Sequence, residues 1–200
     1  MTPSTDLLRT FIAIPVPTRV RDYLIDQMGS LKRQAVRDRI RWVGPEGLHL
    51  TLLFLGDTSP EHPEQYRSEL SNRLEALTPF DLELGDTGTF PHANRPRVFW
   101  IGLESSSTTL VQLKQSLDTF FGERDYAIEK RRFHPHITLG RVKYISPQSN
   151  LVHTLLALDT KRLRFAVQEV VWYQSILHRS GAEYRELQKF TLGREATHGR

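Results

Sequence analysis

The sequence predicts an α+β fold built from two similar lobes. Three observations lead to this prediction. Short β-rich runs alternate with amphipathic helical stretches, the same order of elements occurs twice, and each copy contains a strand of the form His-x-Thr-x. We expect one bilobal domain over residues 1–192, with duplicated units at approximately 8–90 and 97–192 that allow for strand exchange, and a flexible tail at 193–200.

The first unit begins with a β-rich run at residues 8–16, which Pro15 and Pro17 end. Apolar residues at three-to-four spacing then predict an amphipathic helix. The segment at 85–97, with its glycines and prolines, is predicted to be a loop with a short extended piece around Phe90, and it is the expected boundary between the units. The remaining elements expected here are a helix at 18–34, a short strand at 40–43, the first His-Thr strand at 49–56, a helix at 63–77 and a strand at 80–84.

The second unit repeats this order and then closes with a hairpin. Its predicted elements are a strand at 98–103, a helix at 108–121, a short strand at 126–128, the second His-Thr strand from 136, a helix at 146–158, sheet at 163–177, and a hairpin at 170–178 and 184–192 that turns at 179–182.

The composition narrows the possible chemistry. The chain has 200 residues, of which 38% are hydrophobic and 25% charged, which suits a globular domain with its own core. It has no cysteine, so disulfides, iron–sulfur clusters, thiolate zinc sites and cysteine nucleophiles are excluded. The net charge of +4 favours anionic partners such as nucleotides or RNA. The apolar run at 11–16 is too short to span a membrane, so we expect a cytoplasmic protein.

The two His-Thr strands are the candidate site. Side chains alternate between the faces of a strand, so His49 and Thr51 share one face, and His136 and Thr138 share one face of theirs. We expect these faces to meet across a cleft and to handle one phosphate. Spacing alone, however, does not separate such a site from strand residues that merely face solvent.

A family resemblance separates these interpretations. The stretches HLTLLFLGD at 49–57 and FHPHITLGR at 133–141 resemble the two signatures of the two-histidine (2H) phosphoesterases, specifically the RNA 2′,3′-cyclic phosphodiesterases, also called 2′-5′ RNA ligases. The resemblance covers nearly the whole chain. It implies two lobes of antiparallel sheet with outer helices and a central cleft. It also implies a monomer that hydrolyses 2′,3′-cyclic phosphate ends of RNA or nucleotides to 2′-phosphates, with no cofactor and no metal.

The resemblance also assigns roles. It makes His136 the base that activates water and His49 the acid that protonates the leaving O3′. The residues themselves leave the opposite assignment open, and the roles must exchange in the reverse direction. The hydroxyls of Thr51 and Thr138 would donate hydrogen bonds to the non-bridging oxygens. Arg141 would hold the phosphate. Arg141 lies three residues after Thr138, so an ideal strand would put it on the opposite face. The strand must therefore end or twist at Gly140.

Several further residues leave alternatives open. His134 lies on the same strand face as His136, which permits a metal pair, although a supporting role is favoured because no third ligand is evident. One of five aromatic residues is expected to stack on a base: Trp42, Phe54, Trp100, Trp172 or Tyr173. Four basic residues either steer RNA or form a solvated face: Arg97, Arg131, Arg132 and Lys143. Two functions compete with hydrolysis: an RNA-end binding module without turnover, and 2′-5′ ligation as the main activity.

Overall fold

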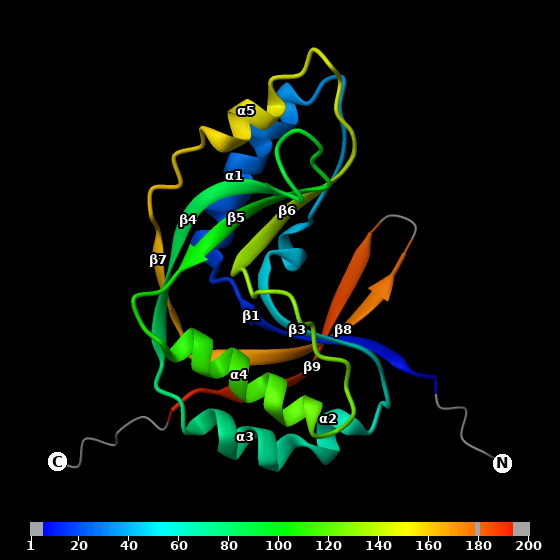
Figure 1. Ribbon diagram of the computed structural model, residues 1–200, viewed down its shortest axis with the longest axis vertical. Coiled ribbons are helices and arrows are strands. Elements are labelled where there is room, and N and C mark those ends of the chain that lie inside the picture. The colour runs from blue at the N-terminus through cyan, green and yellow to red at the C-terminus, as the bar shows by residue number, and fades with distance from the viewer. Residues whose placement is uncertain (1–5, 179–180, 194–200) are drawn as a thin grey trace.

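The computed structural model describes residues 6–178 and 181–193. In these residues nine strands form one sheet, in which all paired strands are antiparallel. The strand order is β7-β4-β5-β6-β3-β1-β8-β9, and β2 also pairs with β6. Figure 1 shows this sheet curling through the molecule, with the helices on its outer side.

The elements have the following bounds. The strands are β1 (Leu8–Pro15), β2 (Arg39–Trp42), β3 (His49–Thr58), β4 (Phe80–Phe90), β5 (Val98–Glu104), β6 (His136–Tyr144), β7 (Arg164–Val167), β8 (Glu169–Leu177) and β9 (Ala182–Thr191). The helices are α1 (Thr18–Gln34), α2 (His62–Gln65), α3 (Arg67–Glu75), α4 (Thr109–Gly122) and α5 (Leu151–Leu156), with a 3-10 turn at Pro45–Gly47.

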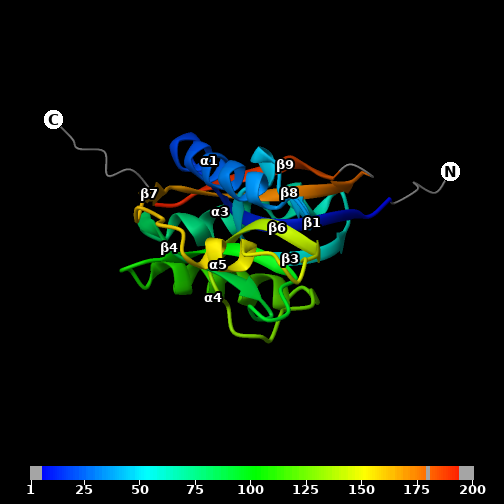
Figure 2. The same cartoon turned by 90° about the horizontal axis from the view of Figure 1, so that it is seen from above.

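The sheet has two lobes, each covered by its own helices (Figure 1). The first lobe consists of β3, β1, β8 and β9, with α3 against β9 and α4 against both α3 and β3. The second consists of β7, β4, β5, β6 and β2, with α5 against β4 and α1 against α5. In Figure 2, β1, β8 and β9 lie along one side and β4 toward the other, with β6 and β3 between them.

The two sequence halves are interleaved in space. β4, from the first half, pairs with β5, whereas β8, from the second half, pairs with β1. The helices cross as well. α1 precedes β3 in the chain but belongs to the second lobe, where the Tyr23 hydroxyl donates a 2.6 Å hydrogen bond to the carbonyl of Asp159. Both lobes therefore need both ends of the chain to fold.

The lobes meet where β3 and β6 run side by side. Only one ladder pair joins these strands, Leu50 opposite Ile137. Further along β6 its free edge is taken by β2, which pairs from Trp42 opposite Gly140 to Arg39 opposite Tyr144. β3 thus leaves β6 after the His-Thr motifs, and the sheet divides there.

The apolar residues fill two separate clusters. The large core lies between the sheet and the helices and includes fully buried Phe99, Phe120 and Trp172. A small second cluster occupies the opposite face of the first lobe and consists of Phe11, Ala13, Val171 and Tyr173, with Tyr184 packed against it. No helix in the described ranges is long and apolar enough to cross a membrane.

The α+β prediction is confirmed, but four predicted elements need correction. The loop expected at 85–97 was wrong in its first part, because β4 runs without a break to Phe90 along β5, whereas only a short extended piece around Phe90 was expected. The strand expected at 126–128 is absent, because Tyr126 turns inward and its hydroxyl lies 2.6 Å from Nδ1 of His62. The helix expected at 63–77 divides into α2 and α3 at Tyr66, and that expected at 146–158 spans only 151–156.

Two predictions concern residues outside the described ranges. The hairpin of β8 and β9 is present as expected, but residues 179–180 of its turn are not described. Of the predicted tail at 193–200, only Gly193 is described.

Gly88 on β4 provides a test of this packing. The indole ring of Trp100 lies against β4 at Gly88. A Cβ built on Gly88 would lie 2.2 Å from Cζ2 of this ring. We expect Gly88→Ala to cost about 1–3 kcal/mol of stability, because the indole ring must shift. At about 2–4 °C per kcal/mol, calorimetry should record a clear fall in Tm. Gly44→Ala is the control, since its added methyl meets no atom within 4 Å. Equal Tm values for the two variants would contradict the packing.

Candidate functional site

The two His-Thr motifs share one face of the sheet. With Leu50 opposite Ile137, continuing the antiparallel register by one residue each way sets His49 beside Thr138 and Thr51 beside His136. All four side chains are half-buried, whereas Leu50 and Ile137 point into the core. We call the surface formed by His49, Thr51, His136 and Thr138 the histidine face.

The flanking strands pair with both motifs in the same way. On β1, Pro15 lies opposite His49 and Ala13 opposite Thr51. On β5, Gly102 lies opposite His136 and Trp100 opposite Thr138. After each Thr the ladder skips one residue, which is Leu52 in β3 and Leu139 in β6. Each motif therefore ends in a β-bulge, which reverses the alternation of the residues that follow.

This bulge explains the position of Arg141. Without it, Arg141 would point away from Thr138, as its odd offset predicts. With Leu139 unpaired, Arg141 lies opposite Val98, two residues along β5 from the partner of Thr138, and so returns to the histidine face. The expected irregularity near Gly140 is present. The alternative that the strand ends there was wrong, because β6 continues to Tyr144.

His49 is enclosed by three aromatic rings. It stacks on Phe11, with ring centroids 4.9 Å apart and 28° between planes, and lies 6.0 Å from Tyr173 at 20°. Tyr184 meets it edge-on at 5.2 Å. Because these rings keep water from the imidazolium, burial lowers the pKa of His49 to about 4. His49 is therefore neutral at pH 7 when the site is empty.

His136 lies in an equivalent aromatic setting, with one added hydrogen bond. Phe90 and Trp100 contact it edge-on, with centroids 5.0 and 6.3 Å away. Its Nδ1 lies 2.7 Å from the carbonyl oxygen of His134. A carbonyl only accepts, so Nδ1 must carry a hydrogen, and Nε2 has the free lone pair in the neutral ring.

The pKa of His136 is also lowered. Burial is the largest cause, and the hydrogen bond to the His134 carbonyl opposes it. The charges of His134 and Arg141 lower this pKa further. Arg141 is thus close enough to His136 to act on its charge, as a group that binds the same phosphate would be.

His134 lies beside the second motif. Its ring packs edge-on against Trp100 with centroids 4.7 Å apart, and it lies 6.2 Å from the ring of His136. In the described ranges no group of three or more His, Asp and Glu side chains is arranged to hold a metal ion. Its ring contacts thus lie with Trp100 and His136, and its role stays a prediction.

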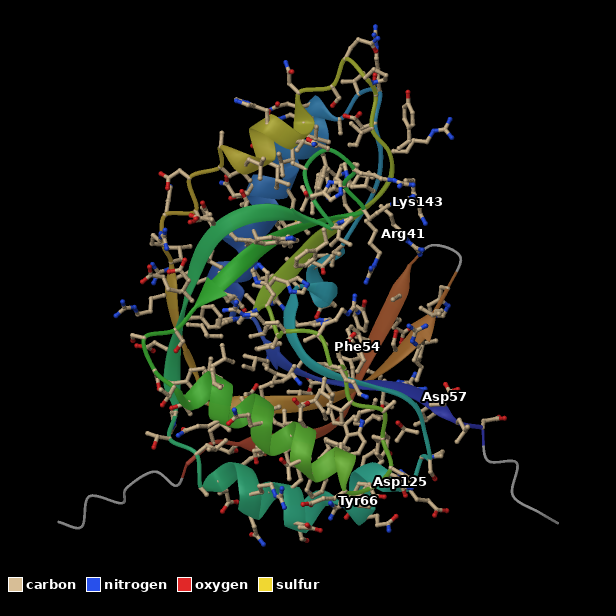
Figure 3. All side chains as sticks on the ribbon, viewed as in Figure 1. Arg41, Phe54, Asp57, Tyr66, Asp125 and Lys143 are labelled. Atoms are coloured by element: carbon tan, nitrogen blue, oxygen red, sulfur yellow. The ribbon has the colours of Figure 1, made fainter. Side chains whose placement is uncertain are left out.

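The cations around the site are of two kinds. Arg131 forms a 2.5 Å ion pair with Glu129, two residues before it in the chain. Arg41, in contrast, pairs across the strands with Arg141, and neither forms an ion pair with a described residue. Figure 3 shows Arg41 and Lys143 on the second lobe, near the β8–β9 hairpin. Sequence reasoning missed Arg41, because nothing local predicts that β2 pairs with β6.

Comparison with known proteins identifies the family. A family model described as the 2′-5′ RNA ligase superfamily matches residues 23–178. This chain belongs to that superfamily. A relative named RNA 2′,3′-cyclic phosphodiesterase from Thermus thermophilus is 33% identical, over 96% of this chain and 93% of its own length. One of the same name from Thermotoga maritima is 30% identical, over 90% and 93%.

Solved structures share the fold. A crystal structure of a Thermus thermophilus protein has a TM-score of 0.77 and 30% identity, covering 94% of this chain and 100% of that one. Escherichia coli LigT, solved in complex with 3′-AMP, has a TM-score of 0.72 and 28% identity over 94% and 99%. The predicted family, its fold and the hydrolase class are confirmed.

The burial of His49 predicts a pH-dependent stability. An unfolded histidine titrates near pH 6.5, and His49 in the fold titrates near 4. Between these values the unfolded chain binds one more proton at His49 than the folded chain does. The contribution of His49 to the free energy of unfolding is therefore fully present above pH 6.5 and is lost as the pH drops to about 4. The full loss is about 3 kcal/mol. Urea unfolding of wild type and His49→Gln from pH 7 to 4 should show a smaller acid loss in the variant. Parallel curves would contradict the burial.

Proposed function

We propose that this chain is an RNA 2′,3′-cyclic phosphodiesterase, which hydrolyses the cyclic phosphate at RNA or nucleotide ends to a 2′-phosphate. The observation that carries the proposal is the pairing of Leu50 with Ile137, which sets two imidazoles and two hydroxyls on one face. The names of the relatives support the substrate. We further propose that the reaction needs no metal ion, and a monomer and a cytoplasmic location stay predictions.

His136 is the proposed base. A water attacks phosphorus opposite O3′, and its proton must leave as the new P–O bond forms. The hydrogen bond from Nδ1 to the His134 carbonyl fixes the ring and leaves Nε2 to accept this proton. The lowered pKa of His136 keeps the ring neutral and ready to accept at pH 7.

His49 is the proposed acid. Bond cleavage leaves charge on O3′, and a proton from His49 neutralises it. An acid must be protonated before the reaction, whereas His49 is neutral in the empty site. The charge of a bound phosphate supplies the difference, since a nearby anion raises the pKa of an imidazole. In this proposal, substrate binding therefore also favours protonation of His49.

Thr51, Thr138 and Arg141 are the proposed phosphate ligands. Neither Thr hydroxyl hydrogen-bonds to another described residue, so both are free to donate to the non-bridging oxygens. Charge on those oxygens grows as water adds, and donors already in position stabilise it most. Arg141 adds a permanent positive charge on the same face.

The first test removes each histidine. We expect His49→Ala and His136→Ala each to lower kcat by about 10²- to 10⁴-fold on a 2′,3′-cyclic nucleotide, since each removes one proton transfer. Turnover should be unchanged by EDTA, and the product should be the 2′-phosphate by phosphorus NMR. His153→Ala, on α5, which packs against β4 and α1, is the control.

The outcomes separate the competing functions. A 3′-phosphate product or a strict metal requirement would contradict the proposal. A non-catalytic RNA-end binding module predicts no turnover in wild type and tight binding that survives both substitutions. Ligation as the main activity uses the same residues and would appear as 2′-5′ joining when cyclic-phosphate and 5′-hydroxyl ends are both supplied.

The second test removes each hydroxyl without changing side-chain shape. Thr51→Val and Thr138→Val should each lower kcat by about 10- to 1000-fold, because a donor to the transition-state oxygens is lost. Thr→Ser at the same positions should restore most of the rate. If Val and Ser variants are equally slow in steady-state assays, the hydroxyls are not the donors.

A further inference from the structure

Basic side chains continue from the histidine face along β2. Arg41 lies opposite Arg141 in the ladder between β2 and β6, and Arg39 lies two residues further along β2. Ile40 and Trp42 alternate with these arginines and pack against the core, so Arg39 and Arg41 are exposed on the face that carries Arg141. Two cations therefore extend the histidine face on the side of β2.

Lys143 adds a third cation beside them. It is the residue of β6 that the ladder with β2 skips, and its side chain is exposed. Arg41 reaches toward the first lobe, since its Nη2 would lie 3.9 Å from a Cβ built on Gly181 in the turn of the β8–β9 hairpin. Figure 3 shows Arg41 and Lys143 on the part of the second lobe near this hairpin. We call the surface formed by Arg39, Arg41 and Lys143 the basic edge.

The basic edge lacks carboxylate partners. None of its three cations forms an ion pair with a described residue. Residues 130–158, which include all of β6, contain no Asp or Glu. Asp38 precedes Arg39 in the chain, but its two oxygens accept hydrogen bonds from the N–H of Ser146 at 2.8 Å and the hydroxyl of Ser149 at 2.6 Å. Cations elsewhere on the surface have carboxylate partners, among them Arg67 with Glu64, Arg124 with Glu69, Arg162 with Glu104 and Lys189 with Glu169.

The spacing of these cations suits a chain of anions. Arg141 lies about 7 Å along the sheet from Thr138, because two ladder steps on β5 separate their partners. Arg39 lies about 7 Å beyond Arg41, the partner of Arg141. Successive phosphates of an extended RNA strand are separated by a similar distance. Like charges directly opposite each other destabilise a sheet, and an anion bound between Arg41 and Arg141 would offset their repulsion.

From this geometry we propose that the basic edge binds the phosphodiester backbone of an RNA strand on the 5′ side of its terminal nucleotide. The inference rests on the proposed function and adds to it a second anion site, separate from that of the terminal phosphate. A strand whose end lies at the histidine face must leave it, and the basic edge is a cationic surface continuous with that face. Contacts to phosphates alone carry no sequence information, so the edge would favour a strand over a mononucleotide without selecting its sequence.

The first test measures binding without turnover. A short single-stranded RNA with a 2′-phosphate end is titrated into wild type, Arg39→Gln, Arg41→Gln, Lys143→Gln and the triple variant. Each single substitution should weaken binding about 2- to 5-fold, and the triple about 10- to 100-fold. The slope of log affinity against log salt should decrease by about 0.7 for each cation removed, because each neutralised phosphate of a single strand releases counterions.

Two controls isolate the backbone charge. Arg67→Gln removes the same charge from α3, on the outer side of the first lobe, and should bind the RNA as wild type does. An RNA whose linkages before the terminal nucleotide are uncharged methylphosphonates should bind to wild type and to the triple variant equally. Adenosine 2′-monophosphate should do the same, since it has no upstream phosphate.

Kinetics give a second readout. With an RNA that ends in a 2′,3′-cyclic phosphate, the triple variant should raise KM by about the factor lost in binding and leave kcat unchanged, because the edge touches no reacting atom. With 2′,3′-cyclic AMP, both constants should match those of wild type.

The outcomes separate this inference from the proposed function. Equal RNA affinity in wild type and the triple variant, or an equal loss in Arg67→Gln, would overturn the inference. Equal losses on the RNA and the mononucleotide would also overturn it, because the cations would then act on the terminal phosphate. Salt-sensitive RNA binding through the basic edge, with no turnover of either substrate by wild type, would instead overturn the proposed function alone.

Discussion

The pairing of Leu50 with Ile137 is the contact on which the site depends. It is the single ladder pair between β3 and β6, and it lies at the centre of both His-Thr motifs. Both side chains are buried, so a slip of one residue would expose them and turn the imidazoles into the core. The hydrophobic core thus fixes the register, and the register fixes which polar groups face one another.

The bulges give the two motifs different side chains within one geometry. The skipped residues Leu52 and Leu139 are both buried, so each bulge is held by packing. Each returns the residue three positions after the Thr to the histidine face. Similar backbones thereby present Phe54 in one motif and Arg141 in the other. This difference breaks the symmetry of the site.

The aromatic surroundings of the histidines set their protonation. Phe11, Tyr173 and Tyr184 lower the pKa of His49 by excluding water, and Phe90 and Trp100 enclose His136. In such surroundings, charges interact more strongly than in water. The negative charge of a phosphate would therefore shift these pKa values more than it would at an open surface. Interleaving of the halves holds these rings in place, since Phe11 on β1 meets Tyr173 on β8.

The sequence by itself determined the α+β class, the two motifs and the face that each His and Thr occupies, because strand alternation is a local property of the backbone. It also indicated an irregularity near Gly140. Only the tertiary structure decided that β6 continues past it, that β2 brings Arg41 beside Arg141, and that Phe54, among five aromatic candidates, lies exposed on the histidine face. These depend on which strands become neighbours and where a ladder skips a residue. Such features arise from packing between distant segments, which no local pattern encodes.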